Sequence, residues 1–325
     1  MKIRDIDPEP SPMNEEHAAL GIPPVEATIA HPGPHPVIHA AMWFAGLVLF
    51  MLSSFLIGRM FVPGNGIGGT QTILNVLSGD IFWTAALVGF IAQVIDGALG
   101  MAYGITATTF LLATGSSPAM ASASVHIAEI FTTGLSGVAH AKLGNVDRSL
   151  FLRMLIPGML GAILGAVLIT QLDGDAIKPY VSAYLAFMGI YVLRKAFRHK
   201  PPAPKRPRHV GKLALLGGFV DSAGGGGWGP VVTSSLLGSG HDPRTTIGSV
   251  NFAEFFLTLT SGAAFTLLVG TGPWPVVAGL VFGGLFAAPL AAVLCRKLKA
   301  RTLLILVGGL VSGLSLFNLW RALAI

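Results

Sequence analysis

Long apolar segments follow one another through most of this 325-residue chain, and they constrain its fold more than any other feature. An α-helix needs roughly 20 apolar residues to cross the hydrocarbon core of a bilayer. Only 11% of the residues are charged, whereas a soluble domain has about 25%. We therefore expect an all-α integral membrane protein. The candidate segments are 39–61, 82–113, 118–140, 149–171, 177–196, 212–238, 244–270, 274–296 and 302–323.

An internal repeat organises most of these segments. Shifting the chain by 125 positions aligns residues 96–137 with 221–262 without a gap, and 17 of the 42 aligned positions are identical. Shared hydrophobicity would not align acid with acid, so the chain is expected to contain two homologous halves, 82–197 and 212–323, preceded by one extra span at 39–61. Identical pairs include Asp96/Asp221, Gly100/Gly225, Gly104/Gly229, Thr108/Thr233, Pro118/Pro243, Ser124/Ser249, Glu129/Glu254 and Ser136/Ser261.

Basic residues predict the orientation of the chain in the bilayer, because cytoplasmic loops are rich in Lys and Arg. Two loops, 194–212 and 296–301, are strongly basic, and the connection at 270–274 has no charge. Both basic loops are therefore expected inside and the uncharged one outside. Two spans join 243 to the second basic loop, so residue 243 must also lie inside.

Segment 212–238 then has to leave and return on the same side, as a re-entrant hairpin broken at the Gly run 224–227. Its counterpart 82–113 is expected to break at 96–104. Each half would have one hairpin and three full spans, an odd number of crossings. The halves would therefore have inverted topology, as in many secondary transporters. The alternative is that each long segment crosses once and the halves are parallel.

The glycine-rich breaks are the first candidates for a binding site. A helix that resumes near Gly104 or Gly229 presents free N–H groups and a positive dipole end, which favour an anion. Unwound backbone at membrane depth is tolerated only where it is buried in protein or lines a cavity. Two such helix starts from inverted halves would form an anion cradle. The alternative is that the glycines only permit close helix packing.

Polar side chains near the breaks supply the remaining candidates. Acids inside a membrane are costly and usually functional, so Asp96, Asp221, Glu129 and Glu254 are expected to hold protons or to serve structurally, with helix capping as the alternative for the two aspartates. His126 lies three residues before Glu129 on the same helix face and titrates near neutral pH. The remaining candidates for contact with the substrate are Ser124, Ser249, Asn251, Tyr103 and Trp228.

Other functions find less support in the sequence. A membrane serine hydrolase built on Ser136 with His126 and His140 is disfavoured, because Ser136 recurs as Ser261 without a matching histidine. A passive anion channel is a further alternative function, and a homodimer is a candidate assembly. No zinc-type spacing, phosphate-binding loop or cofactor motif is present, and nucleic-acid binding is not expected. The single cysteine, Cys295, excludes an intrachain disulfide.

Two polar segments lie outside the apolar pattern. Residues 1–38 are rich in Pro and His and too acidic for a signal peptide, so they are expected to form a disordered cytoplasmic tail. Residues 198–211 are basic and rich in Pro, and are expected to form a cytoplasmic loop between the halves.

Taken together, the repeated segments resemble the sulfite exporter TauE/SafE family of membrane permeases. The resemblance covers roughly 82–323 and depends on the Gly breaks, the prolines at 118 and 243, the ASASVHIAE stretch at 121–129, GSVNFAE at 248–254, SGxxH at 136–140, GNVD at 144–147 and the Gly-rich stretch at 158–166. It implies transport of a sulfur oxyanion or organosulfonate, such as sulfite, thiosulfate or sulfoacetate, across the bacterial cytoplasmic membrane, with protons as the coupling ion. The chain departs from the family in its tail, its extra first span and its first break, which reads GALGMAYG.

Overall fold

The computed structural model describes residues 35–61, 69–99, 101–197, 209–239, 243–270, 274–297 and 300–324. Within these ranges the regular structure is entirely helical. The predictions for residues 1–34 of the tail, for 198–208 of the basic loop and for Gly100 fall outside the described residues.

The first part of the chain forms an extra helix, a short surface helix and the first half. The short surface helix α3 was not predicted from the sequence. The helices are α2 (Pro36–Phe61), α3 (Gly69–Leu77), α4 (Asp80–Leu99), α5 (Tyr103–Ala113), α6 (Pro118–Lys142), α7 (Arg148–Gln171) and α8 (Gly174–Ala196). The break predicted at 96–104 is confirmed, because α4 ends at Leu99 and α5 begins at Tyr103.

The second half repeats this order, with a broken pair followed by three long helices. Its elements are α9 (Val210–Gly224), the π-helical turn η1 (Gly229–Thr233), α10 (Ser234–Gly238), α11 (Pro243–Val269), α12 (Trp274–Lys297) and α13 (Ala300–Leu323). The predicted break at 221–230 is also confirmed. Gly225 and Gly226, between α9 and η1, have φ of 70° and 142°, which glycine adopts without steric cost.

Local sequence signals position the ends of the helices. The side chain of Ser117 accepts a hydrogen bond from the Met120 N–H at the start of α6, and Pro118 follows at the first helical position. Asp147 caps α7 in the same way through the Leu150 N–H. These caps allow α6 and α7 each to begin only a few residues after the preceding helix ends.

Close helix contacts join the two halves crosswise. The first helix of each broken pair packs against the second long helix of the other half: α4 against α12, and α9 against α7. Both contacts depend on glycine, since a Cβ at Gly283 would overlap the Ala86 carbonyl oxygen and one at Gly161 would overlap the Leu215 carbonyl oxygen. Small residues are therefore what permits the backbones to approach here.

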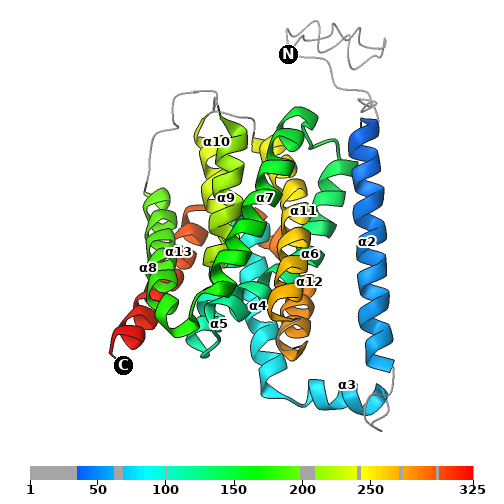
Figure 1. The fold of residues 1–325 in the computed structure, drawn as a ribbon. Helices are drawn as coiled ribbons and strands as arrows, with labels where there is room; N and C mark the ends of the chain where they lie inside the picture. The colour runs from blue at the N-terminus through cyan, green and yellow to red at the C-terminus, as the bar shows by residue number, and fades with distance from the viewer. Residues whose placement is uncertain are drawn as a thin grey trace, which may run out of the picture.

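Figure 1 shows the two broken pairs entering the bundle from opposite sides. The outer ends of α4 and α5 lie at the bottom of the view, whereas α10 lies at the top, at the same end of the bundle as the start of α2. The long helix α2 stands at the edge of the bundle, and α3 runs along the bottom. This arrangement supports the inverted-topology interpretation of the repeat.

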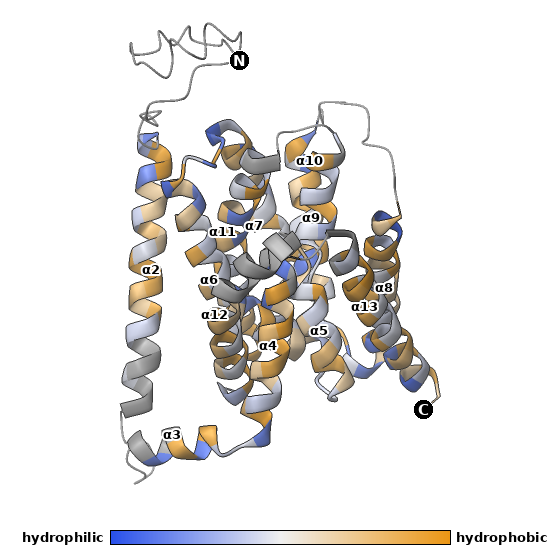
Figure 2. Cartoon of the chain, turned by 180° about the vertical axis from the view of Figure 1, so that it is seen from behind, coloured by the Kyte–Doolittle hydropathy of each residue, from blue (hydrophilic) through white to orange (hydrophobic). Residues whose placement is uncertain are grey.

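Helix length and composition identify a multi-pass membrane protein. Five described helices are long and apolar enough to span a bilayer: Pro36–Ser54, Arg148–Gln171, Gly174–Ala196, Thr245–Val269 and Leu304–Leu323. Hydrophobic residues cover much of the outer surface of the helices, and hydrophilic ones occur in the middle of the bundle (Figure 2). With 25 residues, α6 is roughly 37 Å long, but its Ser, Thr, His and Glu residues lower its hydropathy.

Candidate functional site

The two breaks cross each other inside the bundle, and glycine permits the contact. A Cβ on Gly104, at the start of α5, would lie 2.7 Å from the Gly226 Cα. A Cβ on Gly226 would overlap the Ile105 backbone nitrogen, and one on Gly229 would lie 2.7 Å from the Met101 Cβ. Unwound backbone from one half thus touches unwound backbone from the other. The crossing places the predicted Gly104 and Gly229 together.

The two predicted aspartates cap the resumed helices. The Tyr103 N–H donates to Asp96 Oδ1 at 3.4 Å, and the Trp228 N–H donates to Asp221 Oδ1 at 2.8 Å. In each half the acceptor precedes the donor by seven residues, so the same cap occurs twice. The capping alternative is therefore what the structure shows for both, although Asp221 has a further partner.

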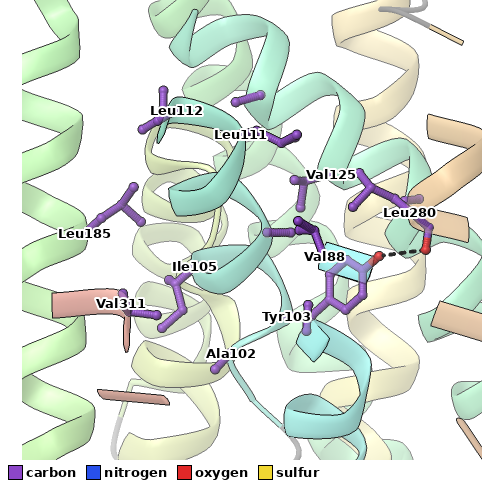
Figure 3. Packing of buried hydrophobic residues seen from close by; sticks show 14 of the residues in the cluster. Val88, Ala102, Tyr103, Ile105, Leu111, Leu112, Val125, Leu185, Leu280 and Val311 are labelled. Atoms are coloured by element: carbon purple, nitrogen blue, oxygen red, sulfur yellow. Dashed lines mark hydrogen bonds between the residues drawn. The ribbon is translucent and has the colours of Figure 1, made fainter. Parts of the chain in front are cut away.

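The predicted aromatic pair, Tyr103 and Trp228, is buried, and each side chain donates a hydrogen bond to a backbone carbonyl of a long helix. The Tyr103 hydroxyl donates to the Leu280 carbonyl oxygen at 3.4 Å, as Figure 3 shows beside Ala102 and Ile105. The Trp228 indole N–H donates to the Val250 carbonyl oxygen at 3.2 Å. These rings hold the breaks in place within the core.

An ion pair between the halves lies beside the crossing. His126 Nε2, on α6, is 3.0 Å from Asp221 Oδ2, and the two side chains are 0% and 4% exposed. His126 Nδ1 lies 2.7 Å from the Ser122 carbonyl oxygen, one turn earlier on α6. The Ser122 hydroxyl donates to the Ser222 carbonyl oxygen at 2.7 Å, which ties α6 to α9.

These contacts bear on where the hydrogens of the pair lie. The 2.7 Å contact with the Ser122 carbonyl oxygen needs a hydrogen on His126 Nδ1, because a carbonyl oxygen only accepts. The Ser122 hydroxyl oxygen lies 3.2 Å from the same nitrogen. With a hydrogen on Nδ1, the 3.0 Å contact between Nε2 and Asp221 is a hydrogen bond only when one more proton is present, on Nε2 or on the carboxyl group.

Glu129 completes a buried cluster with this pair. Its side chain is on the same face of α6 as His126, as predicted, and one oxygen atom each from Glu129 and Asp221 and a ring nitrogen from His126 lie within 4.8 Å of one another. Glu129 is 3% exposed, and its Oε2 has no hydrogen-bond partner. Two carboxyl groups and an imidazole in this arrangement can hold protons or a small cation.

Further buried hydroxyl groups without partners surround the breaks, and sequence reasoning missed them. They belong to Thr106 on α5, Ser222 on α9 and Thr233 on η1. Buried polar atoms usually have partners, so these three hydroxyls are free to bind a polar ligand. The signal in the sequence is that each lies within six residues of a break, but Ser and Thr are too common in membrane helices to be singled out by that alone.

The remaining predicted residues lie on α6 and α11. Ser249 accepts a hydrogen bond from the Asp147 N–H at 2.8 Å, and so connects α11 to the α6–α7 loop. Ser124 and Asn251 are buried, whereas Glu254 is half-buried. The structure therefore gives Ser249 a structural contact between the halves, away from the His126–Asp221 pair.

Comparisons with known proteins agree with this picture. A protein of Bacillus subtilis named "Probable membrane transporter protein YtnM" is 45% identical over 249 residues, covering 73% of this chain and 83% of the relative. A protein of Xylella fastidiosa named "Probable membrane transporter protein" is 26% identical over 257 residues, covering 74% of this chain and 94% of the relative. No solved structure matches.

The family comparison covers both breaks and all the long helices that surround them. Residues 85–317 match the family described as Sulfite exporter TauE/SafE. The family and the named relatives indicate a membrane transporter and not an enzyme, so the hydrolase alternative based on Ser136 has no support. This chain belongs to the sulfite exporter TauE/SafE family of membrane transporters.

Proposed function

We propose that this transporter carries a small sulfur-containing anion, coupled to protons, by alternating access across the bacterial cytoplasmic membrane. Sulfite, thiosulfate and organosulfonates such as sulfoacetate are the proposed substrates. The family description, which names sulfite export, supports this substrate class. The relative in Bacillus subtilis supports a bacterial membrane.

The observation that carries proton coupling is the His126–Asp221 contact. With a hydrogen on His126 Nδ1, this contact is a hydrogen bond only when a further proton is present, and Glu129, with a free oxygen, lies within 4.8 Å of both groups. Loss of the proton leaves an acceptor facing an acceptor, so the contact should weaken. Since His126 belongs to one half and Asp221 to the other, the proton is suited to controlling how the halves fit together.

The crossing of the breaks supports the site for the anion. The helix starts at Tyr103 and Gly229 meet there, and helix starts favour negative charge. Hydroxyl groups of Thr106, Ser222 and Thr233 are buried nearby without partners and can donate to an oxyanion. The anion can bind beside the acid cluster when the carboxyl groups are protonated, because protonation removes their negative charge.

The opposite entry of the broken pairs supports alternating access. Hairpins that enter from opposite sides and meet in the middle can expose the same site to either side in turn. In the present conformation the ion pair and Glu129 are buried, so access requires one half to move against the other.

Purified protein in liposomes tests the proposal. Uptake of sulfite, thiosulfate, sulfoacetate and sulfate would be measured with and without an imposed pH gradient, and again after a protonophore. We expect saturable flux of at least one sulfur anion that rises with the gradient and falls with the protonophore. Flux that never saturates would indicate a channel, and flux insensitive to the gradient would remove protons from the mechanism.

A further inference from the structure

A lysine that the sequence places among the loop charges turns inward in the structure. Lys195 lies in the last turn of α8, next to Arg194. Lysines near helix ends usually extend toward water or lipid headgroups. Arg194 is exposed, as that rule predicts, but Lys195 is half-buried. Lys195 thus behaves differently from its neighbour in the same turn.

The Lys195 ammonium group contacts one residue of the first break and one residue that follows the second. Its Nζ donates to the Ser234 hydroxyl oxygen at 3.0 Å, at the start of α10, and lies 3.5 Å from the Met101 sulfur, just before α5. Met101 packs against Gly229 at the crossing. Because Met101 contacts Gly229, the ammonium group lies next to a residue of the crossing.

No group in the described part of the chain neutralises this charge. Both acceptors are neutral, and the thioether is a weak one. The ion pair of His126 with Asp221 is separate, and no described carboxylate pairs with Lys195. An ammonium group has three donors, so one remains after these two contacts. A partly buried cation without a counter-ion is costly, and a bound anion would offset that cost.

We propose that Lys195 and Ser234 form a binding station for a small oxyanion, such as sulfite or the sulfonate group of an organosulfonate, on the side of the crossing where α8 ends. The Lys195 ammonium supplies charge-assisted hydrogen bonds. The Ser234 hydroxyl accepts from Lys195 and donates to the Met101 sulfur at 3.6 Å, and it can exchange this weak acceptor for the anion. The station admits or releases the anion on that side. In taking the bound anion to be the transported one, this inference rests on the proposed function.

The test compares three variants with wild-type protein. Lys195→Gln removes the charge, Lys195→Arg keeps it, and Arg194→Gln removes an exposed charge from the same turn as the matched control. Each purified variant would be checked for a single symmetric peak in gel filtration. Binding of thiosulfate and sulfite would be followed by thermal shift, and flux by uptake of labelled thiosulfate into liposomes.

We expect Lys195→Gln to weaken anion binding and raise the KM roughly tenfold to hundredfold, as loss of a charged hydrogen bond predicts. Lys195→Arg should retain most of the binding, and Arg194→Gln should match wild type. If Lys195→Gln does not fold, Ser234→Ala provides the second test, with an expected increase in KM of severalfold.

The outcomes separate the two proposals. Wild-type flux with unchanged binding and KM in Lys195→Gln or Ser234→Ala would overturn the binding station alone. Binding that depends on Lys195 without any flux in wild type would support the station and overturn the transport of these anions. Absence of both binding and flux for thiosulfate and sulfite would overturn both.

Discussion

At the scale of single residues, the two halves differ where it matters for titration. The repeat relates His126 to Asn251 and Asp221 to Asp96. An asparagine cannot gain or lose a proton, so only the His126–Asp221 pair includes a ring that can. Both aspartates nevertheless cap a helix through the N–H seven residues later. The cap is a shared structural feature, and the proton pair is a feature of one side.

This difference predicts unequal effects of Asp221→Asn and Asp96→Asn. Asparagine keeps a side-chain oxygen for the cap in both variants, but at 221 it also removes the carboxylate that faces His126. We expect Asp221→Asn to reduce flux driven by a pH gradient at least about tenfold, with a smaller loss in Asp96→Asn. Liposome uptake checks this, with Tm in detergent as the control for folding. Equal losses would mean that the caps, not the proton pair, limit transport.

The contact between the breaks predicts a strong effect of Gly226→Ala. Gly226 has φ of 142°, which is unfavourable for alanine, and its Cβ would overlap the Ile105 nitrogen. A penalty of roughly 2–4 kcal/mol is expected from strain and overlap, with a lower Tm. Gly309→Ala is the matched control, because its Cβ would meet nothing within 4 Å. A Gly226→Ala protein as stable as the control would contradict the tight crossing.

At the scale of elements, the sequence predicted what local patterns determine. Apolar length located the long helices, and glycine runs located the breaks, since a helix cannot continue stably through them. His126 and Glu129 were placed on one face by helical spacing. The short helix α3 was missed because nine residues, Gly69–Leu77, contain polar residues and are too few to span a bilayer.

These local patterns do not predict contacts between segments that are distant in the sequence. The touching of Gly104 and Gly226 depends on how two breaks approach in three dimensions, which no local spacing specifies. Lys195 was counted as a loop charge because its position near the end of a span is typical of one. Its inward direction follows from the placement of Met101 and Ser234, which lie 94 and 39 residues away in sequence.

Each broken pair predicts its own pattern of labelling. Thr114, after α5, and Ser239, after α10, mark the outer ends of the two pairs. In a background with Cys295→Ser, we expect Thr114→Cys to react with an impermeant thiol reagent from outside intact cells. Ser239→Cys should react only after the membrane is opened. Labelling of both positions from the same side would support parallel halves instead.

At the scale of the whole molecule, the contacts between the halves are of two kinds. The crosswise helix pairs, α4 with α12 and α9 with α7, bring backbones together through glycine. The Asp147–Ser249 hydrogen bond and the contact of Gly248 with Asn145 join the α6–α7 loop to α11. These lie at one end of the bundle, where the halves could separate.

Alternating access therefore predicts that fixing this end of the bundle stops transport. Ser249 follows Gly248, where a Cβ would lie 3.0 Å from the Asn145 Cβ, and its hydroxyl contacts the Asp147 N–H at 2.8 Å. Thiols introduced by Asn145→Cys and Ser249→Cys, in the Cys295→Ser background, are therefore expected within reach of a short bifunctional thiol-reactive reagent. We expect cross-linking to reduce uptake to the level of empty liposomes, and a reducible reagent to restore uptake on reduction. Each single-cysteine variant, treated in the same way, controls for modification alone. Unchanged uptake in fully cross-linked protein would show that these segments stay together during transport, and would exclude opening of the halves at this end of the bundle.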